Sequence, residues 1–315
     1  MAENINDVKK TIVFFMLVTN RDAYLASYSI RSYGKLINCL NNYSWKLVVY
    51  CNNLKEQFKQ IYMEEWKKYE YVEIIDNTEF VNINELVPGN IVKSEEGWTK
   101  SIEGKYEPCG VVWTREFRNF QSDYWVTVDA DFEIFSPEFI VEAFEKIEKN
   151  ENLIAMSSDY NDNYHVYDSY SHENIIAMKR YNTWFCIYKK NAQKCKTSHF
   201  YYQEIVHGLR LSFDEGAKFQ WDLREQFGYE MEAVDRKYYR QFIHYGAFSK
   251  NNTLDTPEKI RLYRIITILS HKGLIGSNNI FDKIVRKFFR IIHRLKYKNI
   301  TKERGKLNYH SKLDE

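Results

Sequence analysis

The feature that most constrains the fold is an alternation, over the first quarter of the chain, of short apolar runs with segments of helical spacing. An apolar run of strand length that ends in polar turn residues is typical of a strand buried on both faces. The segments between the runs repeat apolar residues at three and four positions, which predicts helices. This order predicts a parallel sheet with right-handed crossovers, and hence an α/β fold. The strand runs are 11–18, 46–51 and 71–75, and the helical segments are 23–40 and 54–68.

Similar elements return after residues 78–110, a segment punctuated by Pro and Gly that we interpret as a variable excursion over the site. Residues 124–128 predict a strong strand. A helix is expected to open at Ser136-Pro137-Glu138, because Ser is favoured at the N-cap and Pro at the first helical position. Residues 158–180 show no period. The other expected elements are helices at 114–121, 198–211 and 221–227, and strands at 153–157, 183–188, 230–235 and 241–244.

Length and composition narrow the class of protein. The chain has 315 residues, of which 44% are hydrophobic and 28% charged. These values suit one large α/β domain with an appendage, or two modest domains, and exclude a disordered protein. No apolar run reaches the roughly 18 residues of a spanning helix, and the polar N-terminus does not predict a signal peptide. Five scattered cysteines without a Cys-x-x-Cys pair predict reduced thiols, a cytoplasmic protein and no zinc site.

The sequence Asp129-Ala130-Asp131 carries the strongest chemical signal. It follows a buried strand, so both carboxylates should lie at the carboxyl edge of the sheet, where open α/β sheets bind ligands. Two carboxylates on one tight turn suit Mg²⁺ or Mn²⁺ bound to a diphosphate. The structural alternative is a solvated turn between a strand and a helix.

These features resemble the nucleotide-sugar glycosyltransferases of the GT-A fold, over roughly residues 11–250. The most specific stretch is YWVTVDADFEIFSPEF. The resemblance implies an α/β, mostly parallel GT-A sheet, with a catalytic domain at 1–250 divided into a nucleotide-sugar half, 1–131, and an acceptor half, 132–250. It also implies that Asp131 binds a divalent metal, Mn²⁺ or Mg²⁺, and that Asp129 contacts the metal or the ribose.

The resemblance places the nucleotide at the ends of the first two strands. Thr19, Asn20 and Arg21 follow the first strand, and Asn52 ends the second, where many relatives carry Asp. A UDP-sugar donor is favoured. Each of these residues has the alternative of an ordinary loop role. Three basic residues are further candidates to bind the diphosphate: Arg115, Arg118 and Lys250. For the two arginines, the alternative is a surface salt bridge.

An acidic segment lies where inverting members of the family place their catalytic base. Aligning the family pattern on Asp222-Leu223 puts Gln220 at the position of the usual base. We therefore take Asp222 as the first candidate for the base that accepts the acceptor's hydroxyl proton, and Asp214 and Glu215 as alternates. The structural alternative is that Asp222 caps a helix.

His244 is the third candidate metal ligand. Several GT-A enzymes use a C-terminal His in this way, and neutral imidazole suits Mn²⁺. Gly246 follows it and would allow the backbone to pass close to a phosphate. The alternative is a structural histidine.

The chain changes character after residue 250, and we expect a helical, basic extension at 251–315. Residues 283–306 contain ten Lys or Arg and one acid, which leaves the rest of the chain with a net charge of −7. Residues 280–297 combine an apolar helical stripe with basic flanks, a pattern that suits an anionic membrane surface. The alternative is a helix packed on the catalytic domain. Nucleic acid is a weaker expectation, because no base-reading motif accompanies the charge.

The sequence therefore predicts metal-dependent glycosyl transfer to a glycan or lipid-linked acceptor. Inversion is preferred, because an acidic segment lies in the region of the base. The expected setting is bacterial surface polysaccharide or oligosaccharide synthesis at the inner face of the cell membrane. One alternative is a sugar-nucleotide nucleotidyltransferase, which should carry a Gly-rich, basic loop after the first strand, whereas Thr19–Asp22 contains no Gly. The other is a non-catalytic protein that binds glycans or nucleic acid.

Overall fold

The structure is a computed structural model that describes residues 9–20, 22–77, 109–168, 170–197, 202–246 and 257–272. Three sets of predicted functional residues lie outside this part of the chain: Arg21, Lys250 and the amphipathic segment 280–297. The expected excursion lies outside it as well, apart from residues 109 and 110.

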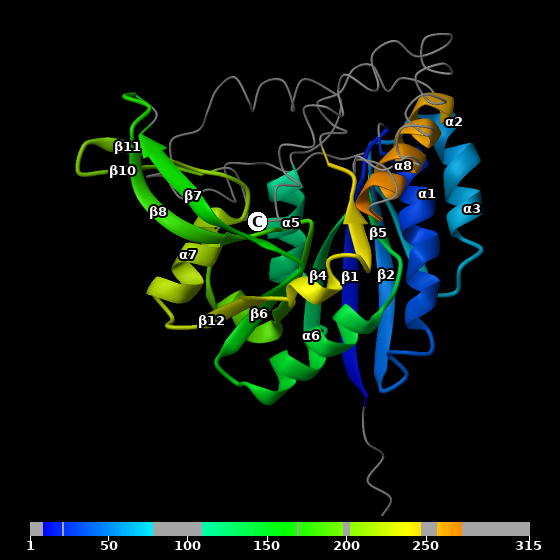
Figure 1. Cartoon of the computed structure of the whole chain (residues 1–315), viewed down its shortest axis with the longest axis horizontal. Coiled ribbons are helices and arrows are strands. Elements are labelled where there is room, and N and C mark those ends of the chain that lie inside the picture. The colour runs from blue at the N-terminus through cyan, green and yellow to red at the C-terminus, as the bar shows by residue number, and fades with distance from the viewer. Residues whose placement is uncertain are drawn as a thin grey trace, which may run out of the picture.

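A seven-stranded sheet forms the centre of the molecule, in the order β12-β6-β9-β4-β1-β2-β3 (Figure 1). Every pair in it is parallel except those that β9 makes with β4 and β6. The carboxyl ends of β1, β2 and β4 therefore meet at one edge, as predicted, and the α/β fold class is confirmed. The strands are β1 (Lys10–Val18), β2 (Tyr43–Asn52), β3 (Val72–Asn77), β4 (Tyr124–Asp129), β6 (Leu153–Ser157), β9 (Phe185–Lys189) and β12 (Glu230–Ala233).

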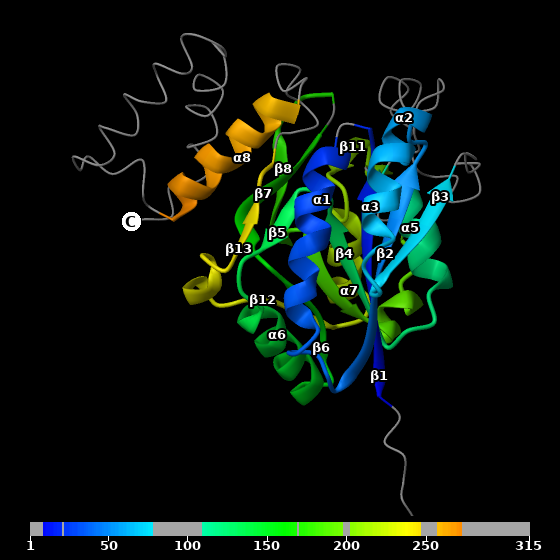
Figure 2. The same cartoon turned by 90° about the vertical axis from the view of Figure 1, so that its right-hand side faces the viewer.

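Helices cover both faces of this sheet (Figures 1 and 2). Alternate side chains of β1 divide between the two faces, as the period of a strand requires. Phe14 and Met16 pack with the helices of one face, and Phe15 and Leu17 with those of the other. The first face carries α1 (Ala23–Ser32), η1 (Tyr33–Leu36), the helical run α2 (Glu56–Phe58), η2 (Lys59–Met63) and α3 (Glu64–Trp66), and α6 (Glu138–Lys149). The second carries α5 (Cys109–Asn119) and α7 (Ala217–Glu225).

A second, antiparallel sheet corrects the sequence analysis. The segment expected to lack regular structure forms β7 (Tyr160–Asp168) and β8 (Asn174–Tyr181), and the helix expected at 198–211 is wrong. That region forms the hairpin of β10 (Tyr202–Val206) and β11 (Leu209–Phe213), and the sheet order is β10-β11-β7-β8. The hairpin turns at His207 and Gly208, whose φ angles of 49° and 82° are typical of a two-residue β-turn.

Smaller shifts occur at helix starts. Helix α5 begins at Cys109 and α7 at Ala217, five and four residues earlier than expected. Helix α6 begins at Glu138, and Ser136 donates to the Glu138 side chain instead of capping a backbone N–H group. Two short 3₁₀ helices, η4 (Lys190–Lys194) and η5 (Arg236–Tyr238), connect other elements.

A two-stranded antiparallel ribbon and a helix complete the described fold. The ribbon pairs β5 (Phe132–Ile134) with β13 (Phe242–His244), and α8 (Pro257–His271) packs beside it. All five cysteines are free, as expected. Within the described ranges, no helix has the length and apolar character needed to cross a membrane.

Candidate active site

The carboxylates of the Asp-x-Asp turn lie at the carboxyl edge of the central sheet. Asp129 is the last residue of β4, and its backbone N–H donates to Trp184 O at 2.9 Å. Ala130 is buried beneath the turn, and Asp131 retains only 8% exposure. Both side chains are thus held at the edge where the connection from β1 to α1 also lies.

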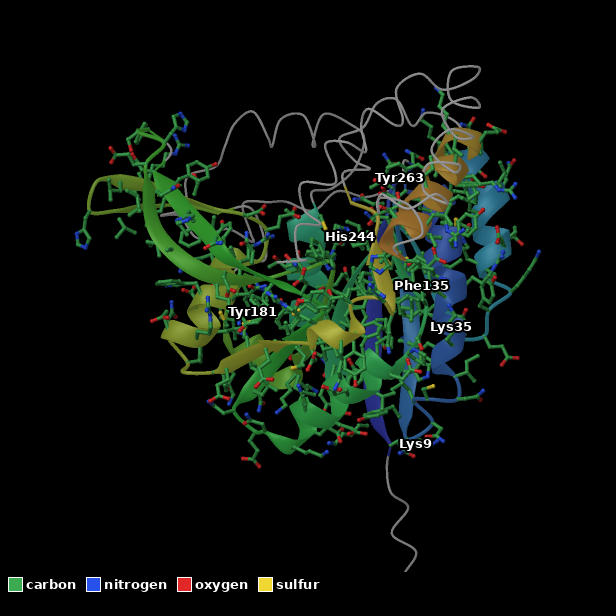
Figure 3. All side chains as sticks on the ribbon, viewed as in Figure 1. Lys9, Lys35, Phe135, Tyr181, His244 and Tyr263 are labelled. Atoms are coloured by element: carbon green, nitrogen blue, oxygen red, sulfur yellow. The ribbon has the colours of Figure 1, made fainter. Side chains whose placement is uncertain are left out.

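His244, which is labelled in Figure 3, completes with Asp129 and Asp131 a group that could hold a metal. Its Nε2 lies 3.2 Å from Asp129 Oδ2 and 3.1 Å from Asp131 Oδ1. One ligand atom from each of the three residues lies within 4.8 Å of the others. Two carboxylates and an imidazole are a donor set that suits Mn²⁺, and the carboxylates also suit Mg²⁺. The structure therefore brings together the three metal ligands that were predicted.

The backbone and an aromatic ring fix the position of His244. Gly246 N donates to Asp131 Oδ2 at 3.0 Å, and Tyr245 N to Asp131 O at 3.1 Å. The Trp184 ring stacks on the imidazole with 4.3 Å between centroids, and its Nε1 donates to Ser158 Oγ at 2.8 Å. Trp184 is a site residue that the sequence analysis missed, since its position just before β9 becomes meaningful only when β9 pairs with β4.

The charges of His244 and the two carboxylates act strongly on one another. Burial would lower the pKa of His244, but Asp131 and Asp129 outweigh it and raise the pKa to about 10. Burial would likewise raise the pKa of Asp131, but the charge and hydrogen bond of His244 hold it below its usual range. At neutral pH without a cation, His244 is therefore protonated and forms ion pairs with the two carboxylates.

Metal binding is consequently expected to release a proton. A cation needs the neutral imidazole, so at pH values below the His244 pKa of about 10 it competes with a proton. Apparent Mn²⁺ affinity should rise by about tenfold per pH unit as the pH increases from about 6 to about 8. Calorimetry in buffers of different ionisation enthalpy measures the proton directly. His244→Asn should bind Mn²⁺ more weakly and without this proton, and a pH-independent affinity in the natural chain would contradict the ligand role of His244.

Two further acids share the surroundings of Asp129. Burial and the charges of Asp214 and Asp129 raise the pKa of Glu215 to about 7, although the backbone N–H of Gly110 donates to Glu215. Burial, together with Asp131 and Asp129, raises the pKa of Asp22 to about 7, against a 2.6 Å hydrogen bond from Thr19 Oγ1. Asp22 was not predicted from the sequence as a site residue, although it directly follows Arg21 in the loop predicted to bind the nucleotide.

The charges of the same acids act on the thiol of Cys109. Cys109 is the first residue of α5. Its thiol pKa is raised first by burial and then by Glu215, Asp129 and Asp22. The acids that raise the pKa of this thiol therefore come from the starts of α1 and α7 and from the end of β4.

The three base candidates have different environments. Asp222 is 2% exposed, and its oxygens bind Lys218 Nζ at 2.5 Å and the Thr197 hydroxyl. It lies inside α7, so the interpretation of Asp222 as a helix cap is wrong. Asp214 is exposed and pairs with Arg180 Nη2 at 3.1 Å. Glu215 lies close enough to Asp129 for the charge of that carboxylate to raise its pKa.

Gly216 places Glu215. Its φ of +75° lies in the left-handed region that favours Gly, and a Cβ there would lie 2.6 Å from Thr183 Cγ2. The chain can therefore turn into α7 immediately after Glu215. Arg180 Nη2 donates to Glu215 O at 3.0 Å and supports the same turn.

Of the predicted nucleotide contacts, Thr19, Asn20 and Asn52 lie at the expected edge, whereas Arg118 lies beside the segment that follows β9, whose carboxyl end pairs with the start of β4. These side chains are engaged within the protein. Asn20 bridges two loops, since its Oδ1 accepts from Lys55 N at 2.7 Å, and Asn52 is buried at the end of β2. Arg115 Nε pairs with Glu116 Oε1 at 2.7 Å and its guanidinium donates to the Tyr50 hydroxyl. Arg118 Nη2 donates to Lys196 O at 2.9 Å. Thr19, another predicted nucleotide contact, donates its hydroxyl to Asp22 Oδ2 at 2.6 Å.

No protein-family model and no curated protein matches this chain. Solved structures similar to it include a mannosyltransferase from Pyrobaculum calidifontis in complex with GDP-Man and Mn²⁺, at 10% identity over 94% of this chain and 84% of that one, with a TM-score of 0.45. Another is glucosyl-3-phosphoglycerate synthase from Mycobacterium tuberculosis with Mn²⁺, UDP and phosphoglyceric acid, at 14% identity over 85% and 80% of the two chains, with a TM-score of 0.42.

A third similar structure is 4-diphosphocytidyl-2C-methyl-D-erythritol synthase from Anaerococcus prevotii, at 10% identity over 72% of this chain and 89% of that one, with a TM-score of 0.41. The three likenesses are remote, and proteins with different names share them. Likenesses this remote show the fold and do not identify an activity.

Proposed function

We propose that this chain transfers a glycosyl group from a nucleotide-sugar to an acceptor, with Mn²⁺ or Mg²⁺. The observation that carries the proposal is the group of Asp129, Asp131 and His244 at the carboxyl edge of a parallel sheet. That edge is where open α/β sheets bind nucleotides. Glu215, a carboxyl group with a pKa near neutrality, lies in the same neighbourhood.

The residues divide into two chemical tasks. Asp129, Asp131 and His244 would hold the cation, which when bound stabilises negative charge on a diphosphate leaving group. Glu215 would accept the proton of the acceptor hydroxyl, since a pKa near the working pH suits a general base. A base on the acceptor side favours inversion. The loops after β1 and β2, with Thr19, Asn20 and Asn52, would hold the nucleoside, and a UDP-sugar is our favoured donor.

The product that is released distinguishes this function from its alternatives. Purified chain is incubated with Mn²⁺ and a panel of UDP- and GDP-sugars, and separately with nucleoside triphosphates and sugar phosphates. A glycosyltransferase releases nucleoside diphosphate from the first set, and EDTA should stop it. Release of pyrophosphate from the second set would indicate a nucleotidyltransferase instead. Absence of turnover on both, with retained nucleotide binding, would support a non-catalytic protein.

We further propose a lipid-linked or glycan acceptor in bacterial surface polysaccharide synthesis, with the chain peripheral on the inner face of the membrane. The support is the basic amphipathic sequence at 280–297, set against a remainder of net negative charge. An interfacial helix would place its Lys and Arg side chains among anionic headgroups, each contributing about 1 kcal/mol.

Liposome binding tests this placement. The full chain is expected to sediment with anionic liposomes and to be released as salt rises, because salt screens charges near the surface. A chain truncated after residue 275, which keeps α8, should stay folded, bind nucleotide and remain in the supernatant. Neutral liposomes are the control. Binding that ignores lipid charge, or unfolding on truncation, would instead indicate a helix that packs on the catalytic domain.

A further inference from the structure

Two of the three candidate metal ligands, Asp131 and His244, are positioned by the β5–β13 ribbon, which is separate from the central sheet, whereas Asp129 ends β4 of the central sheet. Asp131 directly precedes β5, and His244 is the last residue of β13. Phe132 pairs with His244, Glu133 with Ile243, and Ile134 with Phe242. A ribbon of three residue pairs aligns side chains that come from distant parts of the sequence, so its own placement determines whether they converge.

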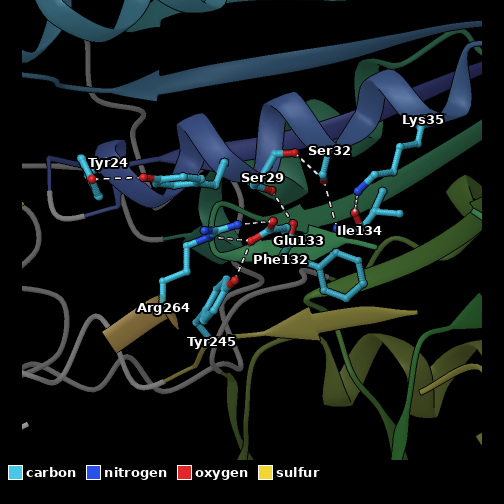
Figure 4. Close-up of polar contacts among 10 residues, drawn as sticks. Tyr24, Ser29, Ser32, Lys35, Phe132, Glu133, Ile134, Tyr245 and Arg264 are labelled. Carbon is cyan, nitrogen blue, oxygen red and sulfur yellow. Dashed lines mark hydrogen bonds and ion pairs between the residues drawn. The ribbon is translucent and has the colours of Figure 1, made fainter. Parts of the chain in front are cut away.

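Helix α1 supports one strand of the ribbon (Figure 4). Ser29 Oγ donates to Phe132 O, and Ile134 N donates to Ser32 Oγ at 3.0 Å. Lys35 Nζ, from the adjoining η1, donates to Ile134 O at 2.5 Å. These bonds position the backbone of β5 on a helix of the central domain.

Helix α8 supports the ribbon through a buried carboxylate. Glu133 is 7% exposed, and Arg264 binds both of its oxygens, with Nε to Oε2 at 2.8 Å and Nη2 to Oε1 at 2.5 Å. The Tyr245 hydroxyl donates to Glu133 Oε2 at 2.5 Å. The neighbouring Tyr263 hydroxyl donates to Tyr245 O at 2.9 Å. Figure 4 shows Arg264 and Tyr245 converging on Glu133.

Tyr245 connects this network to the ligands. It lies between His244 and Gly246, and its own N–H donates to Asp131 O at 3.1 Å. A shift of Tyr245 would therefore move the imidazole and the N–H of Gly246, which donates to Asp131 Oδ2 at 3.0 Å. The Arg264 guanidinium is held in turn over the Tyr28 ring of α1, at 4.0 Å from its centroid.

A buried ion pair of this kind is weak evidence for stability, because the cost of desolvating both charges offsets their attraction. Its geometry, however, is specific, since a planar guanidinium binds a carboxylate in one bidentate arrangement. The pair therefore defines where α8 and the ribbon meet more than how tightly the chain folds.

We propose that Glu133 and Arg264 are positioning residues for the metal site, so that α8 sets its affinity without touching the cation. The inference rests on the metal site of the proposed function. It also places α8, which lies within the segment expected to be an extension, among the elements that build the site.

Mn²⁺ binding to the full chain tests the proposal. Free Mn²⁺ is measured by its paramagnetic resonance signal in titrations of the natural chain, Arg264→Met and Arg264→Lys. Loss of a supporting partner typically weakens metal affinity by about 10- to 100-fold, and we expect at least tenfold for Arg264→Met. Arg264→Lys keeps the charge without the bidentate fork and should be intermediate. Arg261→Met is the matched control, an exposed arginine one turn earlier on α8, and should bind as the natural chain does.

A merely structural role would lower the melting temperature without changing the affinity of the folded fraction, so circular dichroism melts accompany each titration. If Arg264→Met does not fold, Tyr245→Phe removes the hydroxyl that binds Glu133 and Arg264 and should still weaken Mn²⁺ binding. Folded variants that bind within twofold of the natural chain would overturn the proposal. A natural chain that binds no Mn²⁺ would overturn the proposed function and this inference together.

Discussion

Asp131→Asn is expected to abolish glycosyl transfer and the Mn²⁺-dependent part of nucleotide-diphosphate binding. The side chain offers Oδ1 toward His244 at 3.1 Å, while Oδ2 accepts from Gly246 N. An amide of the same shape keeps an oxygen but loses the charge that attracts a cation. Changes to residues behind the ligands cost about 10- to 100-fold in affinity, so loss of a ligand charge should cost about 100-fold or more.

The experiment compares Asp131→Asn with Asp162→Asn, an exposed acid on β7. Calorimetry of UDP with and without Mn²⁺ gives the metal-dependent part of binding, and a coupled assay gives transfer. Melting curves should remain close to that of the natural chain, because the amide still fits the turn. Full transfer by Asp131→Asn, or by the natural chain in EDTA, would contradict the metal role.

The part of the fold that the sequence predicted well is the part with local signals. The strand runs that end at Val18, Asn52 and Asp129 are continuous and apolar, and each ends in polar residues. Because parallel strands bring these ends to one edge, the position of Asp129 and Asp131 follows from pattern and topology together. His244 also joined them, although its expected role came from a family resemblance.

The part that the sequence did not reveal depends on pairing between distant segments. The hairpin at 202–213 overlaps the segment 198–211 that the sequence predicts as a helix. Its apolar residues do not alternate cleanly, and Ile205 and Leu209 are exposed. Its turn residue, Gly208, was the available signal. The contact of Arg264 with Glu133 joins residues 131 positions apart, and neither has a local motif. Such a contact can be predicted only once the ribbon and α8 are placed.

The position at which α7 begins distinguishes the candidates for the catalytic base. Because α7 begins at Ala217, Asp222 is inside the helix and faces Lys218 on the preceding turn. A carboxylate that is 2% exposed and bound at both oxygens has no room for an acceptor hydroxyl. Glu215 precedes the same helix, and its pKa of about 7 reflects burial and the charges of Asp214 and Asp129. The structure thus favours an alternate of the sequence analysis over its first candidate.

Glu215→Gln is therefore expected to lower turnover by about 100-fold or more while donor and Mn²⁺ binding persist, which is the usual size for a lost general base. In the natural chain the rate should rise with pH through the ionisation of Glu215, whose pKa of about 7 without metal would be lowered by a nearby cation. That rise should disappear in Glu215→Gln. Asp214→Asn, which changes the exposed neighbour, is the matched control and should stay active.

Asp222→Asn separates the base from the buried ion pair. Removing one partner of such a pair typically costs about 3–5 kcal/mol, because Lys218 would remain buried without its carboxylate. We expect a lower free energy of unfolding, measured by urea titration, and near-normal turnover per folded molecule. The reverse outcome is equally clear. If Asp222→Asn is folded and inactive while Glu215→Gln is active, Asp222 is the base.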